Sequence, residues 1–281
     1  MSQLYIVSTP IGNLADISHR ALEVLGAVDR VLAEDTRRTL TLLRHYRIDT
    51  PLVSAHEHNE ASRAEQVLGW LDAGETLALV TDAGTPLVSD PGARIVQRAL
   101  AGGHDVIPIP GASAVLAALV GSGLDAEAFT FFGFTPRGGR ERTERLAAVA
   151  ALPHTAVLYE SPGRIGALLQ DLERVCGSAR PVAVARELTK IHETFFRGTL
   201  AEASAHFGRP GVRVRGEIAV VVGGRAADEG DADADEAARV RTRALLGEGL
   251  RPSAVARQVA AEFGVPRNRA YELALSCSET G

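Results

Sequence analysis

Residues 77–92 read LALVTDAGTPLVSDPG, a short apolar run followed by a loop rich in Gly, Pro and Asp. Its first four residues are apolar, as in a buried β-strand, and the run ends abruptly at Thr81 and Asp82. A Gly, two Pro and a second acid, Asp90, come before the next helical pattern. Gly84 permits a positive φ or a close approach of the backbone to a ligand. Because ligands of open α/β sheets bind at such strand-end loops, the stretch is either a ligand-binding loop or a plain strand-to-helix turn.

Four other strand-type runs in the first 123 residues end in the same way. Short apolar runs at 4–8, 31–33, 52–54 and 106–109 are each followed by a polar or Gly/Pro cluster and then by a helical pattern. Five strand–helix alternations predict a domain over residues 1–123 with a mostly parallel sheet and helices on both faces. The clusters would then gather along one edge of the sheet, which is the candidate site.

The rest of the chain divides into three parts. Residues 124–224 mix strand and helix patterns and predict a second α/β domain with a mixed sheet. Residues 225–236 contain six acids and mostly alanine otherwise, which predicts a linker. Residues 237–281 are helical in pattern, and two helices joined through a Gly turn indicate either a helix-turn-helix or a solvated helical cap. Four arginines accompany these helices: Arg251, Arg257, Arg267 and Arg269.

Composition indicates a soluble globular protein. The 281 residues suit two domains, and 46% hydrophobic and 23% charged residues are ordinary proportions. The net charge of -5 does not point to a nucleic-acid partner, although a local basic patch would suffice for one. Cys176 and Cys277 lack metal-ligand spacing and are expected to be reduced thiols. The longest apolar run, 114–120, is far shorter than the roughly 20 residues of a membrane span, so we expect a cytoplasmic protein.

The chain has a single lysine, Lys190, among 30 basic residues. Arginine cannot lose its proton in a protein, whereas a partly buried lysine can. The single lysine is therefore either present by chance or at a position where arginine cannot replace it.

Several familiar chemistries lack their motifs. No P-loop, no G-x-G-x-x-G after the first strand and no G-x-S-x-G elbow occur. His56 and His58 share one face only in a strand, and no Cys joins them, so we expect no metal site. The residues alone therefore predict an α/β enzyme with a ligand cleft lined by backbone amides, acids, Arg and His.

A series of short motifs, taken together, is specific. They are 9–17 (TPIGNLADI), 33–37 (AEDTR), 58–60 (HNE), 82–86 (DAGTP) with 90–92 (DPG), 110–111 (PG), 159–161 (YES), 185–190 (ARELTK) and 216–217 (GE). With these motifs in this order over residues 4–224, the chain resembles the ribosomal RNA small-subunit methyltransferase I family of the tetrapyrrole methylase superfamily.

This resemblance implies a two-domain methyltransferase with S-adenosylmethionine folded into the cleft between the domains. The implied product is a 2′-O-methylated cytidine in the decoding centre of 16S rRNA, made on the assembled small subunit by a homodimer, with no DNA or membrane partner. Two alternatives stay open: a precorrin-type tetrapyrrole C-methyltransferase, and a non-catalytic RNA-binding ribosome-assembly factor. The turn at 9–12, which lacks the Gly-Pro-Gly of tetrapyrrole-modifying relatives, and the basic tail both favour RNA.

The resemblance also suggests site residues. Lys190 is the first candidate for the base or for the group that positions the acceptor oxygen, with His58 and Glu187 as alternatives. Each of three arginines would hold a phosphate or form an internal ion pair: Arg37, Arg164 and Arg186. The expected cofactor contacts are Pro10, Asp82, Thr85, Val88, Ser113, Ala114, Tyr159 and Glu217, although Asp82 would equally serve to cap the turn that follows it.

Overall fold

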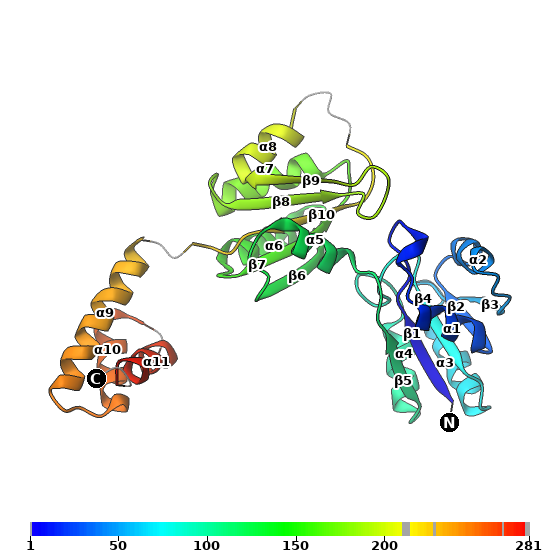
Figure 1. Ribbon diagram of the computed structural model, residues 1–281, viewed down its shortest axis with the longest axis horizontal. Helices are drawn as coiled ribbons and strands as arrows, with labels where there is room; N and C mark the ends of the chain where they lie inside the picture. Colours follow the sequence, from blue (N-terminus) through cyan, green and yellow to red (C-terminus); the bar gives the residue numbers. More distant parts are fainter. Residues whose placement is uncertain (1, 210–213, 227–228, 266, 279–281) are drawn as a thin grey trace. The chain divides into compact units, whose positions relative to one another are not determined.

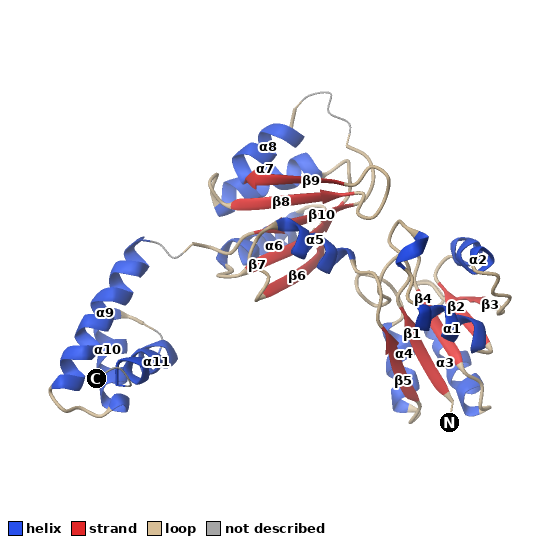
Figure 2. Cartoon of the chain, viewed as in Figure 1, coloured by secondary structure: helices blue, strands red, loops and turns tan. Residues whose placement is uncertain are grey.

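A computed structural model describes residues 2–209, 214–226, 229–265 and 267–278 (Figure 1). The chain forms two compact units, Met1–Arg225 and Ala226–Gly281. The first unit holds both β-sheets, and the second is helical (Figure 2).

The first sheet is fully parallel, in the order β3-β2-β4-β1-β5. Its strands and the helices between them alternate along the chain as expected: β1 (Gln3–Val7), α1 (His19–Ala27), β2 (Arg30–Ala33), α2 (Thr36–His45), β3 (Leu52–Ser54), α3 (Glu60–Asp72), β4 (Leu77–Val80), α4 (Ala93–Ala101) and β5 (Asp105–Ile109), with a short 3-10 turn at Leu14–Asp16.

Both faces of this sheet are covered, which explains why its central strand is apolar throughout. In β4, Leu77 and Leu79 pack under α3 and α4, whereas Ala78 and Val80 pack under α1 and α2. Successive side chains of a strand point to opposite faces, so each face needs its own apolar set. The predicted doubly covered parallel sheet is confirmed.

The second sheet is mixed, in the order β6-β7-β10-β8-β9, with only β6 and β7 parallel. Its elements are β6 (Phe129–Phe134), α6 (Gly139–Ala151), β7 (Thr155–Glu160), α7 (Ile165–Cys176), β8 (Pro181–Arg186), β9 (Thr194–Thr199), α8 (Leu200–Phe207) and β10 (Ile218–Val222). Helices α6, α7 and α8 cover one face.

Helix α5 (Ala114–Ser122) covers the other face of the second sheet. Val115, Ala118 and Leu119 pack on β7, β8 and β10, together with Ile11 from the loop after β1. The sequence placed α5 in the first domain because it follows β5 directly. In the structure its apolar residues complete the second core, so the chain crosses to the second sheet before residue 123.

The second unit contains three helices among its described residues: α9 (Glu229–Gly247), α10 (Pro252–Phe263) and α11 (Arg267–Ser278). Their apolar residues form a separate core that includes Leu245, Val255 and Leu273. Helix α9 begins inside the stretch expected to be a linker. Alanine favours helix, and acids near the first turn are stabilised by the helix dipole, so this composition suits a helix start. Over the described residues, no helix is both long and apolar enough to span a membrane.

Candidate active site

A cavity of about 430 Å³ opens between the loops of the first sheet and the three central strands of the second sheet, β7, β10 and β8. The loops after β1, β2 and β4 and the start of α5 form one side, and β7, β8, β10 and their adjoining loops form the other. Cofactor-sized ligands typically occupy cavities of about 300–1,000 Å³. The predicted gathering of strand-end loops is therefore confirmed for the loops after β1, β2, β4 and β5, which form a site of suitable size, whereas no residue of the loop after β3 lines it.

The loop after β4 is held in place by the loop after β1. Thr9 and Gly84 exchange two backbone hydrogen bonds of 2.8 and 3.0 Å, and the Thr9 hydroxyl donates to the Thr81 carbonyl at 3.1 Å. Gly84 has a φ of +91°. Further along the loop, Leu87 and Ser89 also have positive φ values, 72° and 66°. Such conformations persist only where the surroundings impose them, and they concentrate at functional sites.

Acids from two strand ends face the cavity. Glu34 accepts a hydrogen bond from the Thr81 hydroxyl at 2.9 Å. Asp82 accepts the Asp35 amide at 3.0 Å and forms a 3.3 Å ion pair with Arg38, which also lines the cavity. This wall therefore carries more negative than positive charge and favours a cationic ligand.

Asp90, at the end of the same loop, has a perturbed acidity. Partial burial raises the pKa of Asp90 to about 6, and the nearby charges of Glu34 and Asp82 add to the effect, against a hydrogen bond from Thr81. Its carboxyl therefore exchanges a proton near neutral pH.

A buried acid forms part of the opposite wall. The Glu160 side chain is fully buried, and its Oε1 accepts Arg164 Nε and the Ser161 amide, both at 2.7 Å. Arg164 also donates to the Thr135 carbonyl at 2.7 Å. Glu160 Oε2 is buried without a hydrogen-bond partner. An unmatched buried carboxylate oxygen is costly, so it marks a place for a ligand donor.

Tyr159, beside Glu160, presents an aromatic ring to the cavity. The ring packs against Phe131 and Phe134, with centroids 4.9 and 5.5 Å away. Burial raises the pKa of Tyr159 to about 12, and the charge of Asp90 contributes. Its hydroxyl therefore stays protonated and keeps its capacity to donate a hydrogen bond.

Lys190, in the loop after β8, is not a lining residue, and its contact with the lining residue Glu217 places it at the rim. Its ammonium is 2.9 Å from Glu187 Oε1 and 3.4 Å from Glu217 Oε2, and Glu217 lines the cavity. Partial burial alone would lower the pKa of Lys190, but the two carboxylates outweigh it and the pKa is raised. The hydrogen bond from Lys190, with another from the Glu217 amide at 3.0 Å, lowers the pKa of Glu187. Lys190 is therefore a fixed cation in this arrangement.

The comparisons with known proteins agree on one family. A family model described as Tetrapyrrole (Corrin/Porphyrin) Methylases matches residues 3–204. A ribosomal RNA small subunit methyltransferase I from Synechocystis sp. is 44% identical to this chain over 281 residues, which is 100% of both chains. The protein of that name from Escherichia coli O157:H7 is 45% identical over 97% of this chain and 94% of its own. This chain belongs to the ribosomal RNA small subunit methyltransferase I family.

Solved structures of more distant proteins share the fold of this family member. The methyltransferase CobJ superposes with a TM-score of 0.61 at 18% identity, over 81% of this chain and 95% of that one. Uroporphyrin-III C-methyltransferase from Thermus thermophilus, complexed with S-adenosyl homocysteine, gives a TM-score of 0.56 at 21% identity, over 79% and 97% of the two chains. At these identities the likeness shows the fold alone.

The structure brings together most of the cofactor contacts suggested for this family. Pro10 is buried in the loop after β1 and is not a lining residue. The other seven line the cavity: Asp82, Thr85, Val88, Ser113, Ala114, Tyr159 and Glu217.

The residues suggested for the acceptor are more dispersed. Lys190 and Glu187 meet at the rim, but His58 is exposed, does not line the cavity, and faces His56 with ring centroids 5.9 Å apart. No cluster of three or more His, Cys, Asp or Glu that would suit a metal occurs in the described part of the chain.

All three suggested arginines are engaged with the protein. Arg164 pairs with buried Glu160, and Arg37 binds the Asp35 carboxylate at 2.7 Å while its own side chain is 89% exposed. Arg186 donates to the Thr194 hydroxyl at 3.1 Å and approaches backbone carbonyls. The internal ion-pair alternative therefore describes both Arg164 and Arg37, although most of the Arg37 side chain is exposed, whereas Arg186 forms hydrogen bonds.

Sequence reasoning missed four charged lining residues: Glu34, Arg38, Asp90 and Glu160. Each lies within two residues of a position that was singled out or inside a quoted motif. Which of two adjacent residues faces the cavity depends on loop geometry, and the motifs alone do not supply it.

The cavity residues fit S-adenosylmethionine. Its sulfonium and amino group are cations, and the wall formed by Glu34, Asp82 and Asp90 is acidic. Glu160 Oε2 offers an unused acceptor, and Tyr159 offers an aromatic face and a hydroxyl donor. The donor set thus matches a cofactor with both charged and aromatic parts.

Proposed function

We propose that this chain transfers the methyl group of S-adenosylmethionine to the ribose 2′-hydroxyl of a decoding-centre cytidine in 16S rRNA, within the small ribosomal subunit. The observation that carries the proposal is the 44% identity, over the full length of both chains, to a protein named for small-subunit rRNA methylation. The acidic cavity supports it, because its charge complements the cofactor.

When bound, S-adenosylmethionine supplies a methyl group on a positively charged sulfur, which becomes a neutral thioether as the methyl carbon bonds to the acceptor oxygen. The residues of the chain position the reacting atoms and take up the proton of the ribose hydroxyl. Holding the reacting atoms in line accounts for much of the rate of such a displacement. Glu34 and Asp82 would hold the cationic end of the cofactor, and Tyr159 would pack against its aromatic part.

Lys190 positions the acceptor in this proposal. The two carboxylates that flank Lys190 hold its ammonium at the rim in a fixed place and keep it charged. A charged ammonium donates hydrogen bonds and accepts no proton. We therefore assign Lys190 to orienting the ribose oxygen, and Glu187 to holding Lys190.

Asp90 is the proton acceptor in this proposal. A general base works best when its pKa lies near the operating pH, and the pKa of Asp90 is about 6. Asp90 lines the cavity from the loop after β4, and Glu217, the partner of Lys190, lines it from the start of β10, and the charges of both acids act on Tyr159. His58 is exposed and does not line the cavity, so we assign it no role in proton transfer.

The proposal includes a homodimer acting in the cytoplasm, where the small subunit is. Leu116 and Val120 of α5 are 51% and 75% exposed, and Phe129 is 38% exposed. Exposed apolar side chains of this size support a contact with a second copy. The molar mass in solution tests this point.

The acceptor is tested with labelled S-adenosylmethionine and purified small subunits that lack the modification. Large subunits, protein-free 16S rRNA and a porphyrinoid serve as competing acceptors. We expect label on small subunits alone, and a loss of at least about a hundredfold in Lys190→Ala, with unchanged cofactor affinity. Label on the porphyrinoid would move the function to tetrapyrrole methylation. If the chain binds the cofactor but transfers no methyl group to any acceptor, the result would favour a non-catalytic ribosome-assembly factor.

A further inference from the structure

The helical unit carries a second concave site. An open groove of about 390 Å³ runs between α10 and α11. It is lined by Ser253, Ala256 and Arg257 of α10 and by Arg267 and Tyr271 of α11. On each helix the polar residues are spaced four apart, so they stack on one helix face. Nothing in the methyl-transfer proposal uses this groove.

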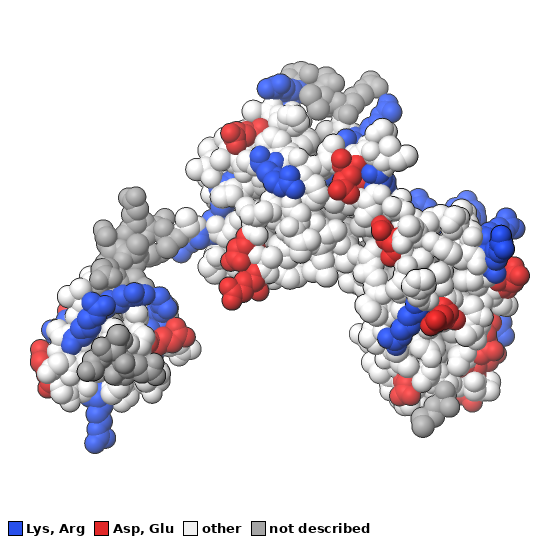
Figure 3. Space-filling model, viewed as in Figure 1, with Lys and Arg blue, Asp and Glu red and all other residues white. Residues whose placement is uncertain are grey.

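The two arginines of the groove are uncompensated. Over the described residues, neither Arg257 nor Arg267 has a side-chain hydrogen bond or an ion pair. Elsewhere in the unit, Arg241 pairs with Glu262 at 3.2 Å. Across the visible face of Met1–Arg225, acidic and basic side chains are interspersed (Figure 3). The groove is therefore a local cationic site in a chain whose net charge is -5.

Tyr271 adds an aromatic surface to these charges. Its side chain is 45% exposed, although a tyrosine of a small helical unit would gain by burial. An exposed ring and two unpaired guanidinium groups that line the same groove match the pattern by which proteins bind single-stranded nucleic acid. Cations hold the phosphates, and a ring stacks on an unpaired base.

We infer that this groove binds a single-stranded segment of RNA, with Arg257 and Arg267 on phosphates and Tyr271 stacked on a base. The inference rests on the proposed function in one respect, namely that the acceptor is RNA. A duplex fits less well, because its stacked bases leave the Tyr271 ring without a partner. The Ser253 hydroxyl lies on the same wall and supplies a further hydrogen bond to the backbone.

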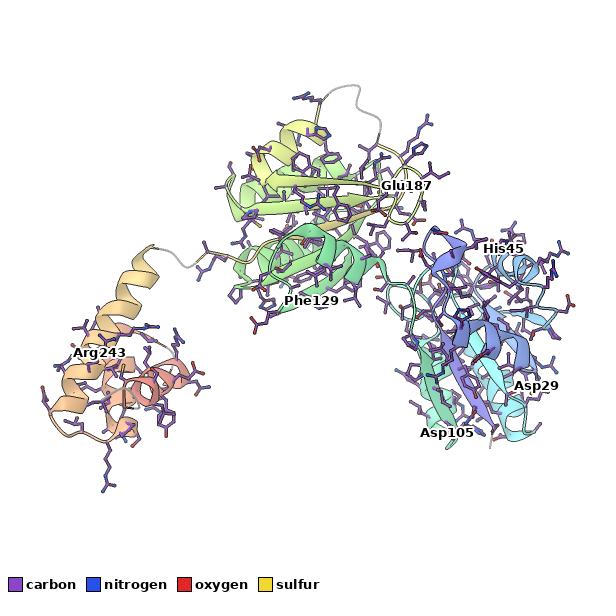
Figure 4. All side chains as sticks on the ribbon, viewed as in Figure 1. Asp29, His45, Asp105, Phe129, Glu187 and Arg243 are labelled. Atoms are coloured by element: carbon purple, nitrogen blue, oxygen red, sulfur yellow. The ribbon has the colours of Figure 1, made fainter. Side chains whose placement is uncertain are left out.

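The experiment uses the full chain and fluorescence anisotropy with a labelled single-stranded RNA of about ten nucleotides, within the usual site size of 4–16. Binding is measured over a range of salt concentrations for Arg257→Gln, Arg267→Gln, Tyr271→Ala and Tyr271→Phe. Arg243→Gln is the matched control, because Arg243 is an exposed arginine of α9 outside the groove (Figure 4).

Each groove Arg→Gln change should reduce the slope of log K against log salt by about 0.7, the value for one lost phosphate contact on a single strand. Tyr271→Ala should weaken binding about fivefold or more with the slope unchanged, whereas Tyr271→Phe should bind like wild type. Arg243→Gln should leave both quantities unchanged. Far-UV circular dichroism checks that each variant keeps its helices.

Three results would overturn the inference: equal losses in Arg243→Gln and the groove variants, wild-type binding in all the groove variants, or equal affinity for an RNA duplex of the same length. Methyl transfer is measured on the same proteins. If the wild type transfers methyl groups and the groove variants bind RNA normally, the groove is not an RNA-binding site and the proposed function stands. If RNA binding depends on the groove but no methyl group is transferred, the groove inference stands and the proposed function fails.

Discussion

Asp90 lies half-buried beside Glu34 and Asp82, and this setting raises its pKa from 3.8 to about 6. A raised pKa means that the folded chain binds the proton more tightly than the unfolded chain does. The carboxyl therefore favours folding at low pH, and this contribution is lost as the pH rises through about 6. Above that pH the ionised Asp90 carboxylate destabilises the folded chain, and a cationic cofactor bound in the cavity would offset this effect.

Asp90→Asn tests this account through two readouts. The wild-type kcat/KM for S-adenosylmethionine, which reports the free enzyme, should rise with pH through about 6 and then level, because only the carboxylate accepts a proton; the variant should lose about a hundredfold or more and show no such limb. At pH 8 the variant without cofactor should be more stable to urea by about 1 kcal/mol, a value discounted for solvent screening. At pH 4 the two should be equal. A variant with wild-type activity would exclude Asp90 as the base.

Lys190 shows how far a residue can be predicted from sequence. As the single lysine it stood out, and the structure places it at the rim of the cavity. Its chemistry was harder to predict, because the pKa depends on how Glu187 and Glu217 approach from separate loops. Arg37 and Arg38 make the same point. Only the geometry of the first turn of α2 pairs Arg38 with Asp82 in the cavity wall and pairs Arg37 with Asp35 outside it.

At the scale of elements, backbone strain gathers in the two loops that face each other across the site. Five non-glycine residues of the described chain have positive φ. Leu87 and Ser89 flank Val88 in the loop after β4, and Glu187 and Thr189 flank Leu188 in the loop after β8. Val88 and Leu188 both line the cavity. Such strain indicates loops held in a set conformation.

Gly12 couples the loop after β1 to the loop that carries Lys190. A Cβ there would lie 2.4 Å from Lys190 Cγ and 2.9 Å from the Leu188 carbonyl oxygen. Gly12→Ala should therefore displace Lys190 and slow methyl transfer by about tenfold or more, since small displacements of positioning groups are costly. Gly26→Ala in α1 is the control. Its Cβ meets nothing within 4 Å, so it should keep full activity and gain up to about 1 kcal/mol of stability. Normal transfer by Gly12→Ala would contradict the role of this contact.

Element prediction succeeded where apolar periodicity and turn residues agreed, as in all five strands of the first sheet. It failed to find α8, although the capping box formed by Thr199 and Glu202 is legible as T-x-x-E. The short α5 was recognised as a helix but assigned to the wrong sheet. Its apolar pattern predicts that the helix is buried but does not predict which sheet it packs against.

At the scale of the whole molecule, the sequence predicted a parallel and a mixed sheet followed by a helical tail, and the structure has all three. The pairing order was beyond reach, because strand neighbours are set by long-range packing. The separate core of α9, α10 and α11 explains how the tail carries a binding surface of its own. The division of labour that we propose places methyl transfer in Met1–Arg225 and an RNA contact in Ala226–Gly281.

The measurement that tests the central claim most directly is the identity of the methylated nucleoside. Small subunits that lack the modification are incubated with labelled S-adenosylmethionine and the full chain, and the rRNA is digested and analysed by mass spectrometry. The account predicts one labelled nucleoside, 2′-O-methylcytidine, in amounts that approach one per subunit. Label on a base, or no label although the cofactor binds, would contradict the claim that the cavity serves a ribose oxygen.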